Sequence, residues 1–300
     1  MLEHEFSEPI TPSRVVVLGE RGFVARRLIA RLHERGISCR AIGSAEVDLV
    51  NPGASVALAR ILGPGDSIVF TSALTPEHGR DRATFFKNVA MADHVCAALD
   101  DVRCSHLVYI SSDSVYGTRN TDIDESSCCE PAEMYPLSHL VREKVLFDAC
   151  SAAGVRLAIL RPTAIFGATD THNAYGPNRF LRSALQEGRI ALFGQGEEER
   201  DHVYIDDVVE LIGLCLMHGS AGILNAASGT AVSFAEVARV TTAAIGRPVV
   251  LESASRRVPI VHRRFRTAAL TRAFPAFWPT SLDQGIRRML SELVMAAGQE

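Results

Sequence analysis

Short apolar runs rich in β-branched residues alternate with amphipathic helical patterns over much of the chain. The runs are five or six residues long and cover residues 14–18, 37–42, 66–71, 106–110 and 155–160. Helical periodicity lies between them, and its longest stretch covers residues 135–153. Strands that alternate with helices build βαβ units, so the pattern predicts an α/β fold with a doubly wound parallel sheet of the Rossmann type.

The pattern changes after Pro162. Residues 167–200 hold five glycines separated by polar and basic residues, which is too long for a plain connection and predicts a functional lobe or lid. Helical periodicity returns over residues 205–216 and 233–245. The first dozen residues show neither pattern and are expected to form a loose tail. We therefore expect a dinucleotide-binding domain of residues 1–166, to which 203–228 return, and a smaller C-terminal α/β substrate lobe of residues 167–202 and 229–300.

The composition excludes several classes of protein. Hydrophobic residues make up 47% and charged residues 22% of the 300 positions, which is typical of a globular chain rather than a disordered or fibrous one. The net charge of −4 does not favour nucleic acid or an anionic membrane as a partner. The acidic start is unlike a signal peptide. The seven cysteines form no CxxC pair and no zinc spacing, so we expect reduced thiols in a cytoplasmic protein and no metal; a redox role for the adjacent Cys128 and Cys129 is the alternative.

A glycine-rich turn stands where the first strand passes into the first helix. Its sequence is Gly19-Glu-Arg-Gly22-Phe-Val-Ala25. Gly19 permits a tight turn, Gly22 lets the backbone approach a pyrophosphate, and Ala25 lets the helix pack on the strand. The helix N-terminus adds amide donors and a positive dipole for phosphate groups. The turn predicts dinucleotide binding, and a tight turn without a ligand is the alternative.

The end of the second strand indicates which dinucleotide is preferred. Sites that prefer NAD place a carboxylate there for the adenosine ribose, whereas this chain has Ile42-Gly43-Ser44. Arg21 brings a cation near the place of a 2′-phosphate, unless it is a solvated surface residue. The predicted cofactor is therefore NAD(P), with a preference for NADP. Asp48 and Leu49 lie where a contact to the adenine edge would fit.

Two further segments carry side chains suited to catalysis. Ser111-Ser112-Asp113-Ser114-Val115-Tyr116-Gly117 follows a strand directly, at the edge where open α/β sheets bind ligands, and Tyr135-Pro-Leu-Ser-His139 opens the long helix. With the glycine turn, these segments resemble the extended short-chain dehydrogenase/reductase superfamily, which includes NAD(P)-dependent nucleotide-sugar epimerases and dehydratases. The resemblance covers nearly the whole chain and includes further segments that begin at Asn88, Arg161, Phe193 and Leu224.

The resemblance implies roles for individual residues. Ser112 would orient the substrate oxygen and Tyr135 would be the general acid/base, while nicotinamide takes or gives hydride. The cofactor-binding residues that it implies are Gly19, Arg21, Gly22, Phe23, Val24, Asp48, Leu49, Ala73, Tyr135 and His139. The substrate-binding residues that it implies are Asp113, Asn178, Arg200 and Arg256, with Arg257 as an alternative to Arg256. Relatives commonly dimerise through the helix that carries the tyrosine, so a homodimer is expected by analogy.

His139 departs from the family pattern. A free tyrosine has a pKa near ~10, and the family lowers it with a lysine four residues further on, one helical turn away. A cation about 6 Å from the phenol, at an effective dielectric of about 20, lowers that pKa by about two units. Histidine, with a pKa near ~6.5, is mostly neutral at pH 7. We expect His139 to hold the nicotinamide ribose and the reaction to be slow or shifted to alkaline pH.

Two more departures narrow the chemistry. The family's 4,6-dehydratases follow their threonine with an Asp-Glu pair, whereas Ser112 is followed by Asp113-Ser114, so the elimination of water lacks its base. The double epimerase-reductases carry a cysteine where this chain has Asp113. We therefore expect an NAD(P)-dependent epimerase or ketoreductase that transfers hydride at C4 of a nucleoside-diphosphate sugar. The alternative is a catalytically weak or inactive dinucleotide-binding sensor or scaffold. His262-Arg263-Arg264 is expected to be a solvated basic face.

Overall fold

A six-stranded parallel sheet forms the centre of the molecule. The computed structural model describes residues 2–256 and 259–298. The strand order is β10-β6-β4-β3-β1-β2, and every neighbouring pair runs parallel. The strands are β1 (Arg14–Leu18), β2 (Cys39–Ile42), β3 (Asp66–Phe70), β4 (His106–Ile110), β6 (Arg156–Pro162) and β10 (Gly222–Ala226). The order reverses at β1, so the predicted doubly wound fold is confirmed.

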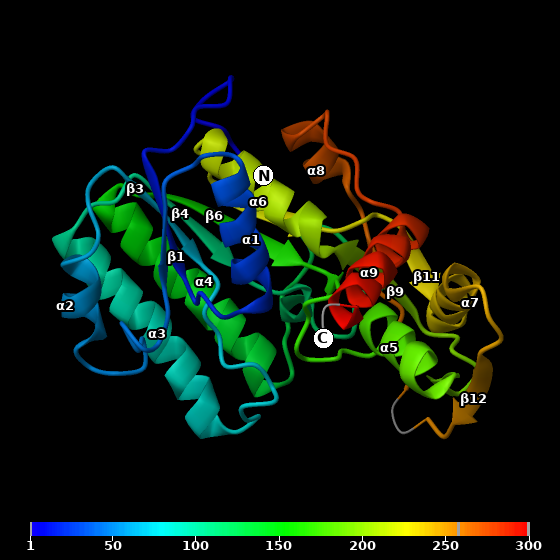
Figure 1. Ribbon diagram of the computed structural model, residues 1–300. Helices are drawn as coiled ribbons and strands as arrows, with labels where there is room; N and C mark the ends of the chain where they lie inside the picture. The colour runs from blue at the N-terminus through cyan, green and yellow to red at the C-terminus, as the bar shows by residue number, and fades with distance from the viewer. Residues whose placement is uncertain (1, 257–258, 299–300) are drawn as a thin grey trace.

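Helices cover both faces of this sheet (Figure 1). The helices on one face are α1 (Phe23–Glu34) and α6 (Ile205–Met217), and those on the other are α2 (Ala54–Ala59), α3 (Arg82–Asp101) and α4 (Met134–Ala153). Side chains alternate along a strand, so β1 supplies both cores: Val15 and Val17 to one, Val16 and Leu18 to the other. This double burial explains why β1 is an unbroken apolar run.

Among the described residues, the remaining strands form smaller sheets beside the central one, with further helices around them. β7 (Ala164–Phe166), β9 (Glu199–Tyr204) and β11 (Ala231–Ser233) form a three-stranded sheet, β8 (Arg189–Phe193) pairs with β12 (Val250–Ala254), and β5 (Asp122–Ile123) pairs with β13 (Arg264–Phe265). The helices there are α5 (Pro177–Glu187), α7 (Phe234–Ile245), α8 (Ala268–Ala273) and α9 (Leu282–Ala297). The glycine-rich stretch 167–200 thus contains α5 and β8. The division into two domains stays a prediction.

The N-terminal segment is ordered against the outer strand of the sheet, so the expectation of a loose tail is wrong. Glu3 and Ala221 exchange two backbone hydrogen bonds of 2.7 and 2.8 Å as an antiparallel bridge. Nδ1 of His4 forms a hydrogen bond with Ser220 Oγ at 2.8 Å, and its ring packs against the ring of Phe274. The partners of this segment lie more than 200 residues away along the chain, which is why local sequence patterns miss them.

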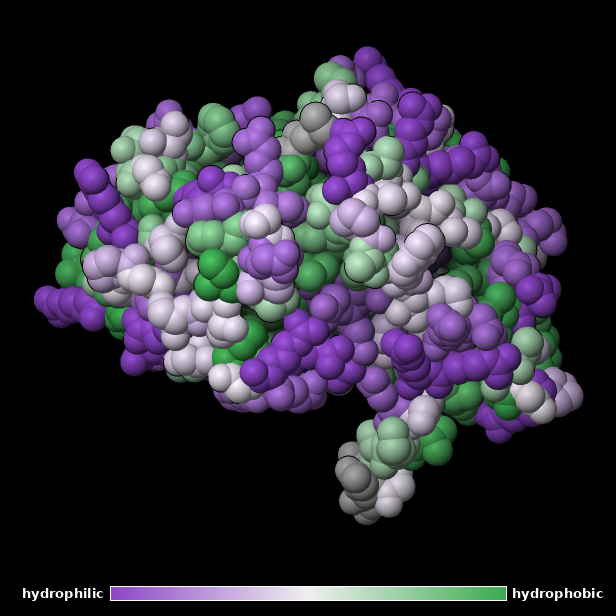
Figure 2. Space-filling model, turned by 90° about the horizontal axis from the view of Figure 1, so that it is seen from above, coloured by the Kyte–Doolittle hydropathy of each residue, from purple (hydrophilic) through white to green (hydrophobic). Residues whose placement is uncertain are grey.

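The surface mixes hydrophilic and hydrophobic side chains on the face seen from above (Figure 2). Among the described residues, every helix falls short of the length or the hydropathy that a membrane span requires. All seven cysteines are free thiols, and four of them are buried, as expected.

Candidate active site

The glycine turn has a backbone that only glycine adopts easily. Gly19 has a φ of +100°, and a Cβ at this position would lie 2.8 Å from Thr71 Oγ1 and 2.9 Å from Ser72 Oγ. Gly22 donates its amide to the Gly19 carbonyl at 2.8 Å and is the N-cap of α1, where no side chain caps the helix. The first amides of α1 are therefore left without a side-chain acceptor, which fits a phosphate group.

The end of β2 lies beside this turn. Arg21 donates from Nη2 to Ser44 Oγ at 2.8 Å, so the predicted cation and the end of β2 come together. The carboxylate of Glu20 packs against Gly43. A Cβ on any other residue at position 43 would clash with this carboxylate. Asp48 accepts the amide of Val50 at 3.1 Å. Leu49 is a core residue, and Phe23, Val24 and Ala73 are buried or half-buried around the turn.

Ser112 and Tyr135 lie on two elements that pack against each other. Ser112 caps the short 3-10 helix η1 (Asp113–Tyr116) by accepting the Ser114 amide, and its hydroxyl lies 2.7 Å from Ser114 Oγ. η1 follows β4 directly and packs on α4, whose first turn carries Tyr135. The fold thus brings both predicted catalytic residues to the carboxyl edge of the sheet, where ligands of such folds bind.

The surroundings of Tyr135 set its ionisation. Burial raises the pKa of Tyr135; the positive charge of Arg142 opposes this, and Asp113 adds to it. The Tyr135 hydroxyl has no hydrogen-bond partner among the described residues. A substrate or cofactor hydroxyl can therefore bond to it without displacing an internal contact.

His139 is a neutral residue in this site. It is completely buried, and burial together with the charge of Arg142 lowers its pKa to about 3. Nδ1 lies 2.7 Å from the hydroxyl of Tyr109, and the ring stands edge-on to Tyr135 with 4.8 Å between the centroids. Nε2 is buried and has no partner. An unpartnered buried nitrogen fits the predicted contact to a cofactor ribose, which stays a prediction.

A buried ion pair that the sequence analysis missed joins the elements behind the site. Arg161 on β6 donates to both carboxylate oxygens of Glu143 on α4, at 2.9 and 2.6 Å. Ser111 at the end of β4 donates to the same carboxylate at 2.5 Å, and Arg161 also donates to the hydroxyl of Tyr116 at 2.9 Å. The sequence indicates Arg161 only as the start of a segment that resembles the family. The signal for Glu143 is its spacing, because it lies one helical turn beyond His139 on the same face of α4.

The two predicted substrate arginines share one carboxylate. Arg200 lies 2.6 Å from Glu198 Oε1, and Arg256 lies 2.9 Å from Oε2 of the same residue. Arg256 also pairs with Glu197 at 3.2 Å. The structure therefore brings Arg200 and Arg256 together, and it neutralises them with a glutamate that the sequence analysis did not single out. Arg257 lies outside the described residues.

Arg263 belongs to the site, so the expectation of a solvated basic face is wrong for this residue. Its side chain is buried, donates to the carbonyls of Asp113 and Gly117, and lies 3.5 Å from the Asp113 carboxylate. Asp113 is therefore paired within the protein. Asn178 is also buried, accepts the Gly167 amide at 3.0 Å, and donates to Asp170 at 2.7 Å. Substrate contacts by Asp113 and Asn178 stay predictions.

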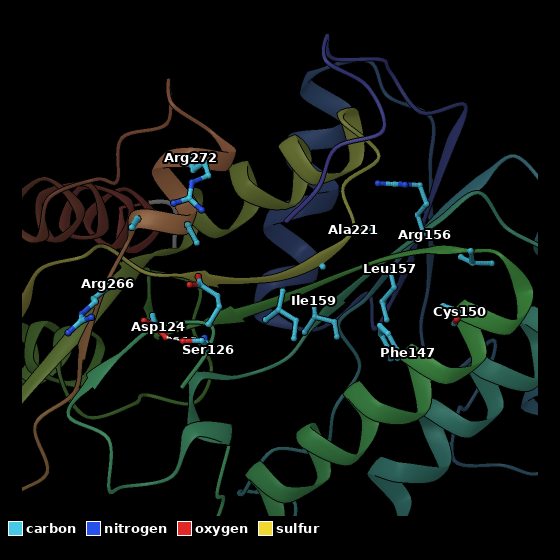
Figure 3. Close-up of a pocket in the computed structure, with 17 residues that line it drawn as sticks. Asp124, Ser126, Phe147, Cys150, Arg156, Leu157, Ile159, Ala221, Arg266 and Arg272 are labelled. Carbon is cyan, nitrogen blue, oxygen red and sulfur yellow. Dashed lines mark hydrogen bonds between the residues drawn. The ribbon is translucent and has the colours of Figure 1, made fainter. Parts of the chain in front are cut away.

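A separate cavity of about 830 Å³ lies away from these residues (Figure 3). Phe147 and Cys150 of α4 and Leu157 and Ile159 of β6 form its apolar wall, and none of the predicted site residues lines it. The cavity is therefore not the place where Tyr135 would meet a substrate.

Comparison with known proteins places the chain in a family. It matches the family model of the NAD dependent epimerase/dehydratase family over residues 15–227. It is 27% identical over 169 residues to an N-acetyl-alpha-D-glucosaminyl-diphospho-ditrans,octacis-undecaprenol 4-epimerase of Escherichia coli O157:H7, covering 55% of this chain and 50% of that protein. It is 30% identical over 219 residues to a 2-alkyl-3-oxoalkanoate reductase of Shewanella oneidensis, covering 65% of this chain and 54% of that protein.

The matched stretches thus span about half the length of these curated relatives. The fold is similar to that of RMD from Pseudomonas aeruginosa complexed with NADPH, with a TM-score of 0.84 and 23% identity over 96% of this chain and 100% of the other. The family model covers the glycine turn, Ser112, Tyr135 and the strands that carry them. The chain belongs to the NAD dependent epimerase/dehydratase family.

Proposed function

We propose that this protein is an NAD(P)-dependent epimerase or ketoreductase that transfers hydride at C4 of a nucleoside-diphosphate sugar. The observation that carries the proposal is the position of Tyr135: a tyrosine with no internal hydrogen bond among the described residues, in the first turn of the helix that packs against η1, which Ser112 caps. When bound, the nicotinamide cofactor supplies and accepts the hydride. Tyr135 would take the proton from the sugar hydroxyl or return it, and Ser112 would hold the same oxygen.

The residues at the start of α1 fit a dinucleotide. Gly19 permits the tight turn in which a Cβ would meet Thr71 and Ser72, and the amides of α1 that no side chain caps would supply donors to the diphosphate. The Arg21–Ser44 contact supports a preference for NADP, because a guanidinium and a hydroxyl are both suitable partners for a 2′-phosphate.

Replacing Arg21 by alanine is expected to weaken NADPH binding by about tenfold, the loss of roughly one charge-assisted hydrogen bond, and to change NADH binding less than about twofold. Isothermal titration with each cofactor measures both dissociation constants. The matched control is Arg26→Ala, which removes an exposed arginine of α1 that donates to the Thr169 carbonyl. Equal losses for NADPH and NADH would contradict a role for Arg21 at the 2′-phosphate.

Arg200 and Arg256 are the proposed clamp for the nucleotide diphosphate. Guanidinium groups bind phosphate oxygens in pairs, which suits this role. In the structure, both arginines form ion pairs with Glu198. A diphosphate must therefore compete with this carboxylate for the same donors.

Replacing Glu198 by glutamine is expected to tighten the binding of nucleoside-diphosphate sugars by about three- to tenfold, because an internal anion that competes with the diphosphate is removed. Displacement of a fluorescent nucleotide sugar measures the affinity. Glu187→Gln, which alters an exposed pair with Arg189, should have no effect. Weaker or unchanged binding in the Glu198 variant would show that this carboxylate is not what the diphosphate displaces.

The ion pairs of Arg200 and Arg256 favour a second candidate function, which is the reduction of a ketone that carries no diphosphate. Glu197 and Glu198 together offset the charges of Arg200 and Arg256, so the clamp offers an anion no net positive charge. The Shewanella relative is named as a reductase of 2-alkyl-3-oxoalkanoates. Removing the negative charge of Glu198 should favour a diphosphate more than a ketone substrate that carries no diphosphate, so the glutamine variant separates the two candidates.

The experiment that tests the proposed function follows nicotinamide absorbance, and separates the sugar products by chromatography, during incubation with UDP-, GDP- and dTDP-sugars and with 3-oxo esters. Turnover of a nucleotide sugar, or its epimerisation with cofactor retained, supports the proposal. Turnover of the oxo esters alone favours the second candidate. Tight cofactor binding without turnover of any compound would replace both with a dinucleotide-binding sensor.

A further inference from the structure

Arg142 is a buried arginine that has no acidic partner. Among the described residues, three arginines are buried, and two of them are paired: Arg161 with Glu143 at 2.6 Å, and Arg263 with Asp113 at 3.5 Å. Within the same part of the chain, no carboxylate lies at ion-pair distance from Arg142. An uncompensated buried charge costs several kcal/mol in folding, so its presence points to a role.

The contacts of Arg142 hold its charge in place without neutralising it. The guanidinium carbon lies 4.4 Å from the centre of the Phe70 ring and 5.0 Å from that of Tyr109. Nη2 donates to the carbonyl of Ser72 at 2.6 Å, whereas Nε and Nη1 have no hydrogen-bond partner. Aromatic faces stabilise a cation through their quadrupole and add no opposite charge. Burial lowers the pKa of Arg142, but a guanidinium ionises so far above neutral pH that the side chain keeps its positive charge between α4 and the ends of β3 and β4.

Tyr135, His139 and Arg142 share one face of α4, because they are spaced i, i+4 and i+7. Tyr109 on β4 links them: its hydroxyl bonds to His139 Nδ1 at 2.7 Å, and its ring lies beneath the guanidinium. The family's lysine stands at position 139, but His139 is neutral in this environment. The only permanent cation of this face lies one turn further along the helix.

The other charged groups around Tyr135 do not supply the missing cation. Asp113 from η1 is negative and is itself paired with Arg263. Tyr109 from β4 is a neutral phenol, because burial raises its pKa. Glu143 on α4 is paired with Arg161. Arg142 is the group that lowers the pKa of Tyr135 against the effect of burial.

We propose that Arg142 is a positioning residue for the reaction: its buried positive charge stabilises the ionised form of the Tyr135 phenol, in place of the lysine that relatives carry at position 139. The part of this proposal that concerns turnover rests on the proposed function. The part that concerns the ionisation of Tyr135 does not require a substrate.

The test places 3-fluorotyrosine at position 135, so that the ¹⁹F resonance reports the ionisation of this ring alone and the fluorine brings its midpoint to lower pH. A buried cation that acts on a phenol at an effective dielectric of about 20 shifts the pKa of the phenol by roughly one to two units. Replacing Arg142 by methionine is therefore expected to raise the midpoint by about that amount, while Arg142→Lys shifts it by less than about half a unit. Arg179→Met, an exposed arginine over the Tyr175 ring, is the control and should shift nothing.

A double variant checks the position of the charge. His139→Lys alone would place a second cation beside Arg142, and mutual repulsion would favour its neutral form. His139→Lys combined with Arg142→Met returns the cation to the family's position, and its midpoint should return to within about half a unit of the original chain. The pH profile of kcat, measured on whichever substrate is turned over, should shift in parallel.

An unchanged ¹⁹F midpoint in a folded Arg142→Met protein would overturn the proposal. Where the methionine variant does not fold, Arg142→Gln, which keeps a donor for the Ser72 carbonyl, gives the same readout. Because the titration needs no turnover, an absence of substrate leaves this test intact. Conversely, full activity in a Tyr135→Phe protein would end the proposed function and leave the charge effect standing.

Discussion

Replacing Tyr135 by phenylalanine is expected to lower kcat by a factor of about 10²–10⁴, the usual contribution of a general acid/base. The phenol is the proton carrier of the proposed reaction, and the first turn of α4 holds no other phenol. The hydroxyl makes no internal hydrogen bond, so thermal stability should not fall. Steady-state kinetics and a melting curve on the same preparation measure the two quantities.

The matched control is Tyr175→Phe. Tyr175 lies just before α5, 40 residues beyond Tyr135, and its hydroxyl accepts the amide of Phe193 at 2.9 Å. This change should leave kcat within about twofold, because the group takes no part in proton transfer. A Tyr135→Phe protein that retains more than about a tenth of the original kcat would remove Tyr135 from the role of acid/base.

Replacing Glu143 by glutamine is expected to lower the free energy of unfolding by about 3–5 kcal/mol, because the guanidinium of Arg161 would be left as an uncompensated buried charge. Both side chains are nearly inaccessible, with 4% and 3% exposed. The pair connects α4 with β6 and, through Ser111, with the end of β4. Urea denaturation followed by circular dichroism measures the loss.

Two comparisons keep this result interpretable. Asp283→Asn breaks the exposed Asp283–Arg287 pair of α9 and should leave stability unchanged, since solvent screens such pairs. Glu143→Leu with Arg161→Met removes both charges at once and should restore most of the loss. A decrease of less than about 1 kcal/mol in Glu143→Gln would indicate that water or a rearranged neighbour already compensates Arg161.

The sequence predicted the central sheet well because its signals are local. The predicted strands 14–18 and 106–110 coincide with β1 and β4, whose side chains are buried on both faces and therefore read as unbroken apolar runs. The predicted helix 135–153 differs from α4 by one residue at its start. The tight turn at Gly19 was expected from glycine alone, and the positive φ agrees with that reason.

The details of the site were not predictable from local patterns because their partners lie far apart in sequence. Arg263 reaches Asp113 across 150 residues and Arg256 reaches Glu198 across 58, so neither pair leaves a periodic trace. The sequence of the helix that carries Arg142 gives no sign of a buried cation. Only the contacts of Arg142 with Phe70 and Tyr109 show that its charge is buried. Charge alone suggested solvent exposure for Arg263, and its tertiary contacts decide otherwise.

The bridge between Glu3 and Ala221 has a consequence for handling this molecule. β10 is an outer strand, and such strands offer unpaired backbone groups to any neighbouring chain in an extended conformation. The first residues occupy those groups where β10 begins. A bulky fusion partner that displaces this segment, or its removal, would expose unpaired backbone groups at the start of β10. Purification tags joined at this end are therefore expected to promote self-association.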